Sequence, residues 1–164
     1  MIFEGYVDSE GKNVILGRSI FSNYEKVCVF DVDDTLLLHK RVYCEGVANG
    51  NGKKILHGQA REVVKMALAD FDRVVFWTIM GSSLQYLTGF PFGEAHQRIV
   101  GGMPCGNVVI KDLGILSRNY MRNVVAIQDG IEEITFEPPN RVVQVGSKDD
   151  LVGKYLEARA MINC

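Results

Sequence analysis

Hydrophobic residues gather in short uninterrupted runs at five places along the chain. The runs are VCVFD (27–31), VVFWT (74–78), NVVI (107–110), NVVAIQD (123–129) and RVVQV (141–145). A strand with one face in water alternates apolar and polar positions, whereas continuous apolar runs of this length are typical of strands buried on both faces. The pattern therefore predicts a parallel sheet that is covered by helices.

Two longer segments have apolar residues at helical spacing. The first, 57–71, has them at Val63, Val64, Ala67, Leu68 and Phe71. The second, 147–162, is also predicted to be a helix, capped at its start by Ser147 or Asp149. Strands that alternate with helices predict a three-layer, Rossmann-like α/β fold. The 164 residues fit a single domain, 1–164.

Three segments do not follow this pattern. Segment 36–56 contains the turn signal N-G-N-G and is predicted to be a hairpin or flap. Its lysines and arginine are expected to form a solvated face, with contact to an acidic phosphopeptide as the alternative. Segment 81–106, rich in glycine and proline, is predicted to be a helix plus an irregular insertion. Residues 1–24 are either a hairpin that leads into the sheet or an arm that packs on a partner, so a dimer stays open.

Composition and charge narrow the class of protein. The formal net charge of -2 argues against a dedicated nucleic-acid binder. The four cysteines form no C-x-x-C pair, and the N-terminus lacks a basic stretch followed by an apolar run. No apolar stretch approaches membrane-spanning length. We therefore expect no membrane contact and a cytoplasmic or nuclear location.

Polar residues suited to phosphate chemistry follow four of the runs, where ligands bind in open α/β sheets. These residues are Asp31, Asp33 and Thr35 after the first run, Thr78 after the second, Lys111 after the third, and Gln128 with Asp129 at the end of the fourth. One such strand end would carry little weight. Four together predict a site.

The chemistry of these residues is that of phosphate ester hydrolysis. A carboxylate nucleophile, Asp31, splits the reaction into two steps through an aspartyl-phosphate. Mg²⁺ prefers oxygen ligands, which the side chains of Asp31 and Asp129 and a backbone carbonyl near Asp33 can supply. Lys111 and Thr78 are expected to contact the phosphoryl oxygens.

Asp33 is predicted to be the general acid and base. It stands two residues from the nucleophile, and the charges of Asp31 and Asp34 are expected to raise its pKa. Asp34 is expected to be solvated or capping, and Trp77 to belong to the core. The three histidines share no motif and are expected to be structural.

At this point the sequence resembles a known family. DVDDTL (31–36) is similar to the D-x-D-x-T motif of haloacid-dehalogenase-superfamily phosphatases. VFDVDDTLL, VVFWT, VIKDLGILSRN and NVVAIQDG, in that order, resemble the small C-terminal-domain phosphatases, as does the tail TFEPPNRVVQV. The resemblance spans roughly residues 25–160. Short members of the group occur in large DNA viruses as well as in eukaryotes.

The resemblance implies a capless, Mg²⁺-dependent phosphatase. By position, Asp31 is the nucleophile and a metal ligand, Asp33 is the acid/base and gives its carbonyl to the metal, and Thr78 and Lys111 contact phosphate. The implied substrate is phosphoserine or phosphothreonine in proteins, such as the repeat tail of RNA polymerase II.

Gln128 departs from the family pattern, which usually has an acidic residue there. Either Asp129 holds the metal, or Gln128 contributes a neutral amide oxygen. Two other functions stay open. One is a nucleotide or polynucleotide phosphatase, and the other is a non-catalytic phosphoprotein-binding module with a weakened metal site.

Overall fold

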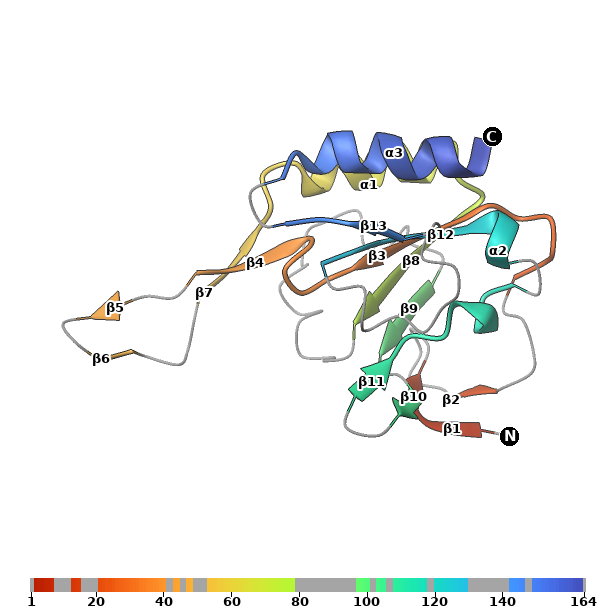
Figure 1. Cartoon of the computed structure of the whole chain (residues 1–164), viewed down its shortest axis with the longest axis horizontal. Coiled ribbons are helices and arrows are strands. Elements are labelled where there is room, and N and C mark those ends of the chain that lie inside the picture. Colours follow the sequence, from red (N-terminus) through yellow and green to blue (C-terminus); the bar gives the residue numbers. More distant parts are fainter. Residues whose placement is uncertain are drawn as a thin grey trace.

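A seven-stranded sheet forms the centre of the protein (Figure 1). The computed structural model describes residues 2–7, 13–15, 21–40, 43–44, 47–48, 53–78, 97–100, 103–105, 108–117, 120–129, 142–146 and 149–163. In spatial order the strands are β13 (Val142–Gln144), β12 (Val124–Gln128), β3 (Val27–Asp31), β8 (Arg73–Thr78), β9 (Gln97–Val100), β1 (Ile2–Val7) and β2 (Asn13–Ile15). The strands from β13 to β9 run parallel. The predicted α/β class is confirmed, and the parallel sheet is broadly compatible with a Rossmann-like fold.

The central strands are buried on both faces, which explains their continuous apolar runs. Along β3, Cys28 and Phe30 join one hydrophobic cluster, while Val27 and Val29 join the other. Successive side chains of a strand point to opposite faces, so both faces of the sheet require apolar residues. Trp77 is fully buried in the second cluster, as predicted.

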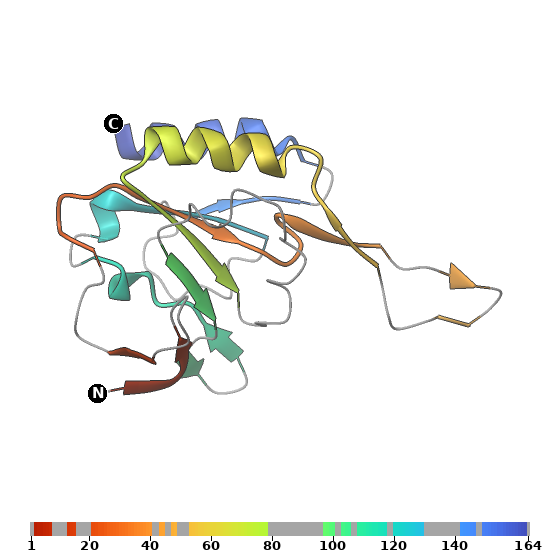
Figure 2. The ribbon, with the colours of Figure 1, turned by 180° about the vertical axis from the view of Figure 1, so that it is seen from behind.

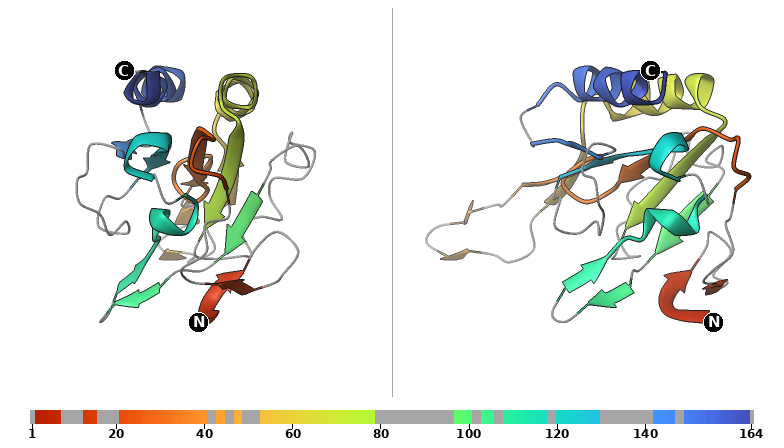
Figure 3. Two further views of the ribbon diagram at one scale, coloured as in Figure 1. Left: turned by 90° about the vertical axis from the view of Figure 1, so that its right-hand side faces the viewer. Right: turned by 45° about the vertical axis from the view of Figure 1, so that its right-hand side comes forward.

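Two helices cover one face of the sheet and lie side by side (Figure 3). They are α1 (Ala60–Asp70) and α3 (Leu151–Asn163), close to the two predicted helices. On α3 the buried positions recur every three or four residues, at Leu151, Tyr155, Ala158 and Ile162. This spacing places them on the stripe that faces the sheet and α1.

Of the two caps predicted for α3, only Asp149 lies among the described residues, and its hydrogen bond goes elsewhere. The Asp149 carboxylate accepts a hydrogen bond from the N–H of Gly146, which lies before the helix, and Ser147 lies outside the described residues. The first N–H groups of α3, on Leu151 and Val152, donate instead to Oε1 of Gln59 at 2.8 and 3.4 Å. Because Gln59 precedes α1, a long-range contact replaces the local cap.

Short helical segments cover the opposite face of the sheet. These are the 3₁₀ helix η3 (Leu113–Ile115) and α2 (Tyr120–Asn123), and their apolar residues pack with Val29, Val75 and Trp77. The third layer is thinner than expected in the described part of the chain. No helix there has both the length and the apolar composition needed to cross a membrane.

The predicted hairpin in 36–56 is present. Strand β4 (Leu37–Lys40) pairs antiparallel with β7 (Lys53–Leu56), and farther out β5 (Tyr43–Cys44) pairs with β6 (Val47–Ala48). Figure 2 shows the hairpin extending away from the sheet and helices. The N-G-N-G sequence (49–52), on which the prediction of a turn rested, lies outside the described residues.

Two other segments differ from the sequence-based expectation. The run NVVI becomes β11 (Val108–Ile110), which leaves the parallel sheet and pairs antiparallel with β10 (Met103–Cys105). Only two residues separate these strands, a length that joins antiparallel but not parallel strands. Segment 81–106 also supplies β9, where an irregular insertion was expected. Residues 81–96 of this segment lie outside the described residues, so the helix predicted within 81–106 stays a prediction. At the N-terminus, β1 and β2 form the hairpin alternative.

Candidate functional site

The candidate site lies at the carboxyl ends of three adjacent parallel strands. Asp31 ends β3 at the centre, Thr78 ends β8 on one side, and Gln128 ends β12 on the other. All three side chains are buried. Because parallel strands end at the same edge, residues 78 and 128 flank Asp31 although they lie far from it in the sequence.

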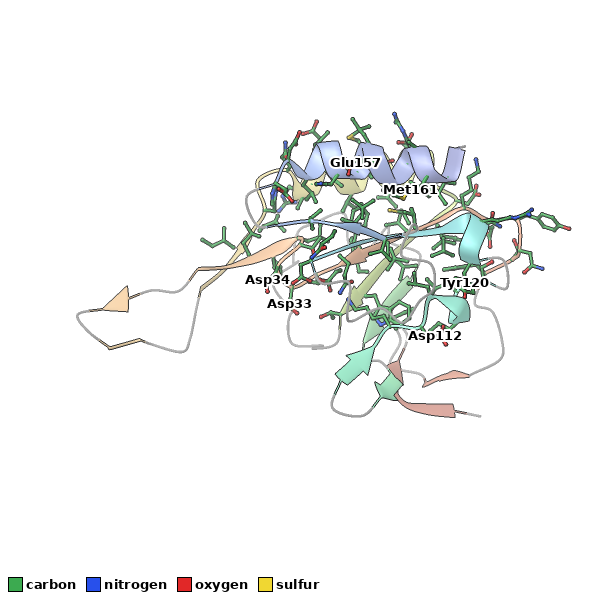
Figure 4. All side chains as sticks on the ribbon, viewed as in Figure 1. Asp33, Asp34, Asp112, Tyr120, Glu157 and Met161 are labelled. Atoms are coloured by element: carbon green, nitrogen blue, oxygen red, sulfur yellow. The ribbon has the colours of Figure 1, made fainter. Side chains whose placement is uncertain are left out.

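A tight turn directly after β3 positions the acidic motif. The carbonyl of Val32 accepts hydrogen bonds from the N–H groups of Leu36 and Leu37, at 3.0 and 2.9 Å. Asp34 has a φ of 61° and its N–H donates to the Leu37 carbonyl. Aspartate is among the few residues that tolerate this left-handed conformation. The turn exposes Asp34, as predicted, and leaves Asp33 half-buried beside it (Figure 4).

Lys111 links two of the strand ends through its ammonium group. Its Nζ lies 2.6 Å from Oδ1 of Asp31 and 3.0 Å from Oε1 of Gln128. Lys111 is 1% exposed, so this is a buried ion pair. The lysine follows β11, which is not part of the parallel sheet, and therefore reaches the site from outside the strand edge.

Two hydroxyl groups complete the contacts of the acidic motif. Thr35 donates from Oγ1 to Oδ2 of Asp31 at 3.2 Å. Thr78 donates from Oγ1 to Oδ2 of Asp33 at 3.1 Å. Both oxygens of the Asp31 carboxylate thus have a donor, and the Asp33 side chain is tied to the neighbouring strand.

Burial raises the pKa of Asp31 well above its ordinary value. The Lys111 ammonium opposes this rise, whereas the nearby Asp129 carboxyl adds to it through a hydrogen bond and its charge. Desolvation and a like charge both disfavour the ionised carboxyl. A cation placed near Asp31 and Asp129 would relieve both effects.

These residues fit Mg²⁺, which is usually bound through one or two carboxylates and keeps several waters. Asp31 and Asp129, with the carbonyl of Asp33, would hold it. Oε1 of Gln128 faces the Lys111 ammonium, which would repel a metal ion, so the arrangement favours Asp129 as the ligand. Among the described residues, no group of three or more His, Cys, Asp or Glu gathers as a metal cluster.

The structure brings together all seven residues singled out from the sequence. It also gives roles that sequence patterns did not: Thr35 is a donor to the nucleophile candidate, and Gln128 is a partner of Lys111. His57 accepts a hydrogen bond from the N–H of Gln59, which precedes α1.

Comparisons with known proteins identify no family for this chain, so any argument about its function rests on the sequence motifs and the geometry described above. No protein-family model matches the chain, and no curated protein matches it.

Proposed function

We propose that this chain is a Mg²⁺-dependent phosphatase of the haloacid-dehalogenase type. Asp31 takes the phosphoryl group from the substrate, and water then removes that group from Asp31. The observation that carries the proposal is the buried Asp31–Lys111 pair at the carboxyl edge of the sheet. A buried carboxylate with a raised pKa and a lysine partner is typical of a reacting group. The D-x-D-x-T sequence around it supports the same assignment.

In the first step an oxygen of Asp31 attacks phosphorus and the bond from phosphorus to the ester oxygen breaks. The leaving oxygen takes a proton from Asp33, which is half-buried and held by the Thr78 hydroxyl. Lys111 balances negative charge on the phosphoryl oxygens while remaining close to Asp31. A bound Mg²⁺ would supply the charge that lets a carboxylate approach a phosphate.

In the second step water attacks the phosphorus of the aspartyl-phosphate and the bond between phosphorus and Asp31 breaks. Asp33, now ionised, accepts a proton from that water, which restores the starting state. One carboxyl can serve both steps because it is an acid first and a base afterwards. The proposed substrate is phosphoserine or phosphothreonine in a protein, by the resemblance of the motifs to the small C-terminal-domain phosphatases.

The test is hydrolysis of an aryl phosphate with and without Mg²⁺, by the wild type and two matched variants. Asp31→Asn should abolish turnover, because the amide cannot form the aspartyl-phosphate. Asp34→Asn makes the same chemical change three residues away, at an exposed position whose φ of 61° suits asparagine. It should retain activity. Turnover that survives in Asp31→Asn would refute the proposal.

A further inference from the structure

Lys111 reaches the candidate site although the strand before it is not part of the central sheet. Asp31, Thr78 and Gln128 are the last residues of parallel strands that the sheet holds in register. Lys111 instead follows β11, which pairs with β10. Its Nζ still lies 2.6 Å from Oδ1 of Asp31, at the end of a long, flexible stem. The chain that follows the lysine must therefore help to fix its position.

The segment after Lys111 is the 3₁₀ helix η3, which is anchored in the core. Leu113, Ile115 and Leu116 are buried in the second hydrophobic cluster, on the face of the sheet opposite α1 and α3. The carbonyl of Leu116 also accepts a hydrogen bond from the N–H of Phe21 at 2.9 Å. Because η3 begins two residues after Lys111, this anchor lies close enough in the chain to hold the backbone of the lysine.

Asp112 connects the lysine to this anchor and caps η3 (Figure 4). Its Oδ1 accepts a hydrogen bond from the N–H of Gly114 at 2.9 Å, and its carbonyl accepts one from the N–H of Ile115 at 3.2 Å. The backbone of Asp112 is extended, with a φ of -84° and a ψ of 98°. The chain thus turns from extended to helical at Asp112, and the carboxylate satisfies an N–H at the start of the helix.

Gly114 leaves room for this cap because it has no side chain. A Cβ on Gly114 would lie 2.9 Å from Oδ1 of Asp112, which is too close for two atoms that are not bonded to each other. An alanine at position 114 would therefore displace the carboxylate from the N–H that it accepts. The cap can be removed in two independent ways, by changing Asp112 or by adding a methyl group at Gly114.

We infer that Asp112 is a positioning residue of the proposed phosphatase. Its carboxylate, bonded to Gly114, fixes the turn that holds the Lys111 ammonium at Asp31. The inference rests on the proposed function and gives Asp112 no contact with the substrate. The property required of Asp112 is a side-chain oxygen acceptor rather than a negative charge. Asparagine should therefore replace it, since asparagine and aspartate are equally good helix caps.

The first experiment measures kcat and KM for an aryl phosphate with Mg²⁺. Asp112→Ala and Gly114→Ala should each lower kcat by roughly 10- to 100-fold, since misplacing a group by about 1 Å can cost 10²-fold, whereas Asp112→Asn should keep the wild-type kcat. Two matched controls should also keep it. Gly58→Ala adds the same methyl group where nothing lies within 4 Å. Asp72→Ala removes a carboxylate that accepts from the N–H of Lys26 at 2.8 Å, at the opposite edge of the sheet.

The second experiment does not depend on turnover and follows urea unfolding in EDTA. If Asp112 holds Lys111 in its pair with Asp31, Asp112→Ala should shift the urea midpoint less in a Lys111→Met background than in the wild type. Asp72→Ala should shift it equally in both. Equal shifts for Asp112→Ala would overturn the inference, as would a wild-type kcat in that variant or an Asp112→Asn variant as slow as Asp112→Ala. A wild type without turnover would refute the proposed function alone, because the urea midpoints still decide whether Asp112 positions Lys111.

Discussion

Replacing Lys111 with methionine tests whether the candidate site is assembled around a buried ion pair. Methionine keeps an unbranched apolar stem and removes the ammonium that lies 2.6 Å from Asp31 and 3.0 Å from Gln128. The variant leaves the Asp31 carboxyl buried with a hydroxyl donor, Thr35, and a nearby acid, Asp129. The result concerns folding free energy, so it holds whether or not the protein is an enzyme.

The expected loss is about 3–4 kcal/mol of unfolding free energy at pH 7. Removing one partner of a buried ion pair typically costs about 3–5 kcal/mol, because the other charge is left uncompensated. The loss of unfolding free energy has an upper limit, because Asp31 can become protonated instead of staying charged and unpaired. Keeping a carboxyl neutral at pH 7, when its pKa in the unfolded chain is about 3.9, costs roughly 4 kcal/mol. Burial already raises the pKa of Asp31 in the wild type, which places the expected loss below that limit.

The assay is urea unfolding in EDTA, followed by tryptophan fluorescence. Trp77 is the sole tryptophan, is fully buried, and pairs in register with Asp31, so it reports on this part of the core. Asp31→Asn and the double variant complete a cycle, in which the two losses should not add because the residues are in contact. A loss under about 1 kcal/mol for Lys111→Met, the size of an exposed pair, would refute the burial argument.

Three further predictions concern the helix pair, the proposed phosphate contact and the proposed metal ligand. Tyr155→Phe removes the hydroxyl that donates to Asp70 across α1 and α3, and urea unfolding should show a loss of about 1.5–3 kcal/mol, since the acceptor is charged; an unchanged midpoint would contradict it. Thr78→Val keeps the side-chain shape but removes one donor at the site, so steady-state kinetics should show kcat about 10²-fold lower, with urea stability as the control. Asp129→Asn should weaken Mg²⁺ binding in calorimetry by roughly 10-fold or more, whereas Gln128→Asp should leave it nearly unchanged; a gain in affinity for Gln128→Asp would contradict Asp129 as the ligand.

Much of the candidate site could be predicted from the sequence, because its polar residues lie at the ends of buried strands. A continuous apolar run identifies a two-sided strand, and parallel strands share one polar edge, so Asp31, Thr78 and Gln128 could be brought together without coordinates. The same logic located the two long helices from their spacing of apolar residues. Strand order was not needed, since any order of neighbouring parallel strands leaves these residues at the same edge.

The remaining features depend on contacts that sequence periodicity does not encode. The run that precedes Lys111 has the composition of a buried strand, yet a two-residue connection commits it to β10, outside the sheet. The lysine reaches the edge all the same, so the residue was predicted for a reason that proved incorrect. The cap of α3 from Gln59 is likewise a contact across 92 positions, which local cap rules cannot find.

The neutral side chain at Gln128 also accounts for the charge balance of the proposed site. Among the described residues, the strand ends bring together the carboxyls of Asp31, Asp33 and Asp129 and one ammonium, that of Lys111, to which Gln128 supplies an uncharged acceptor. When all three carboxyls are ionised, the excess is two negative charges, which a divalent cation would neutralise. A glutamate at position 128 would take the same ammonium and leave one charge more. The glutamine at position 128, where the phosphatases with similar motifs usually have an acidic residue, is therefore compatible with the proposed Mg²⁺ site. Its amide oxygen accepts a hydrogen bond from Lys111 and is not needed as a metal ligand.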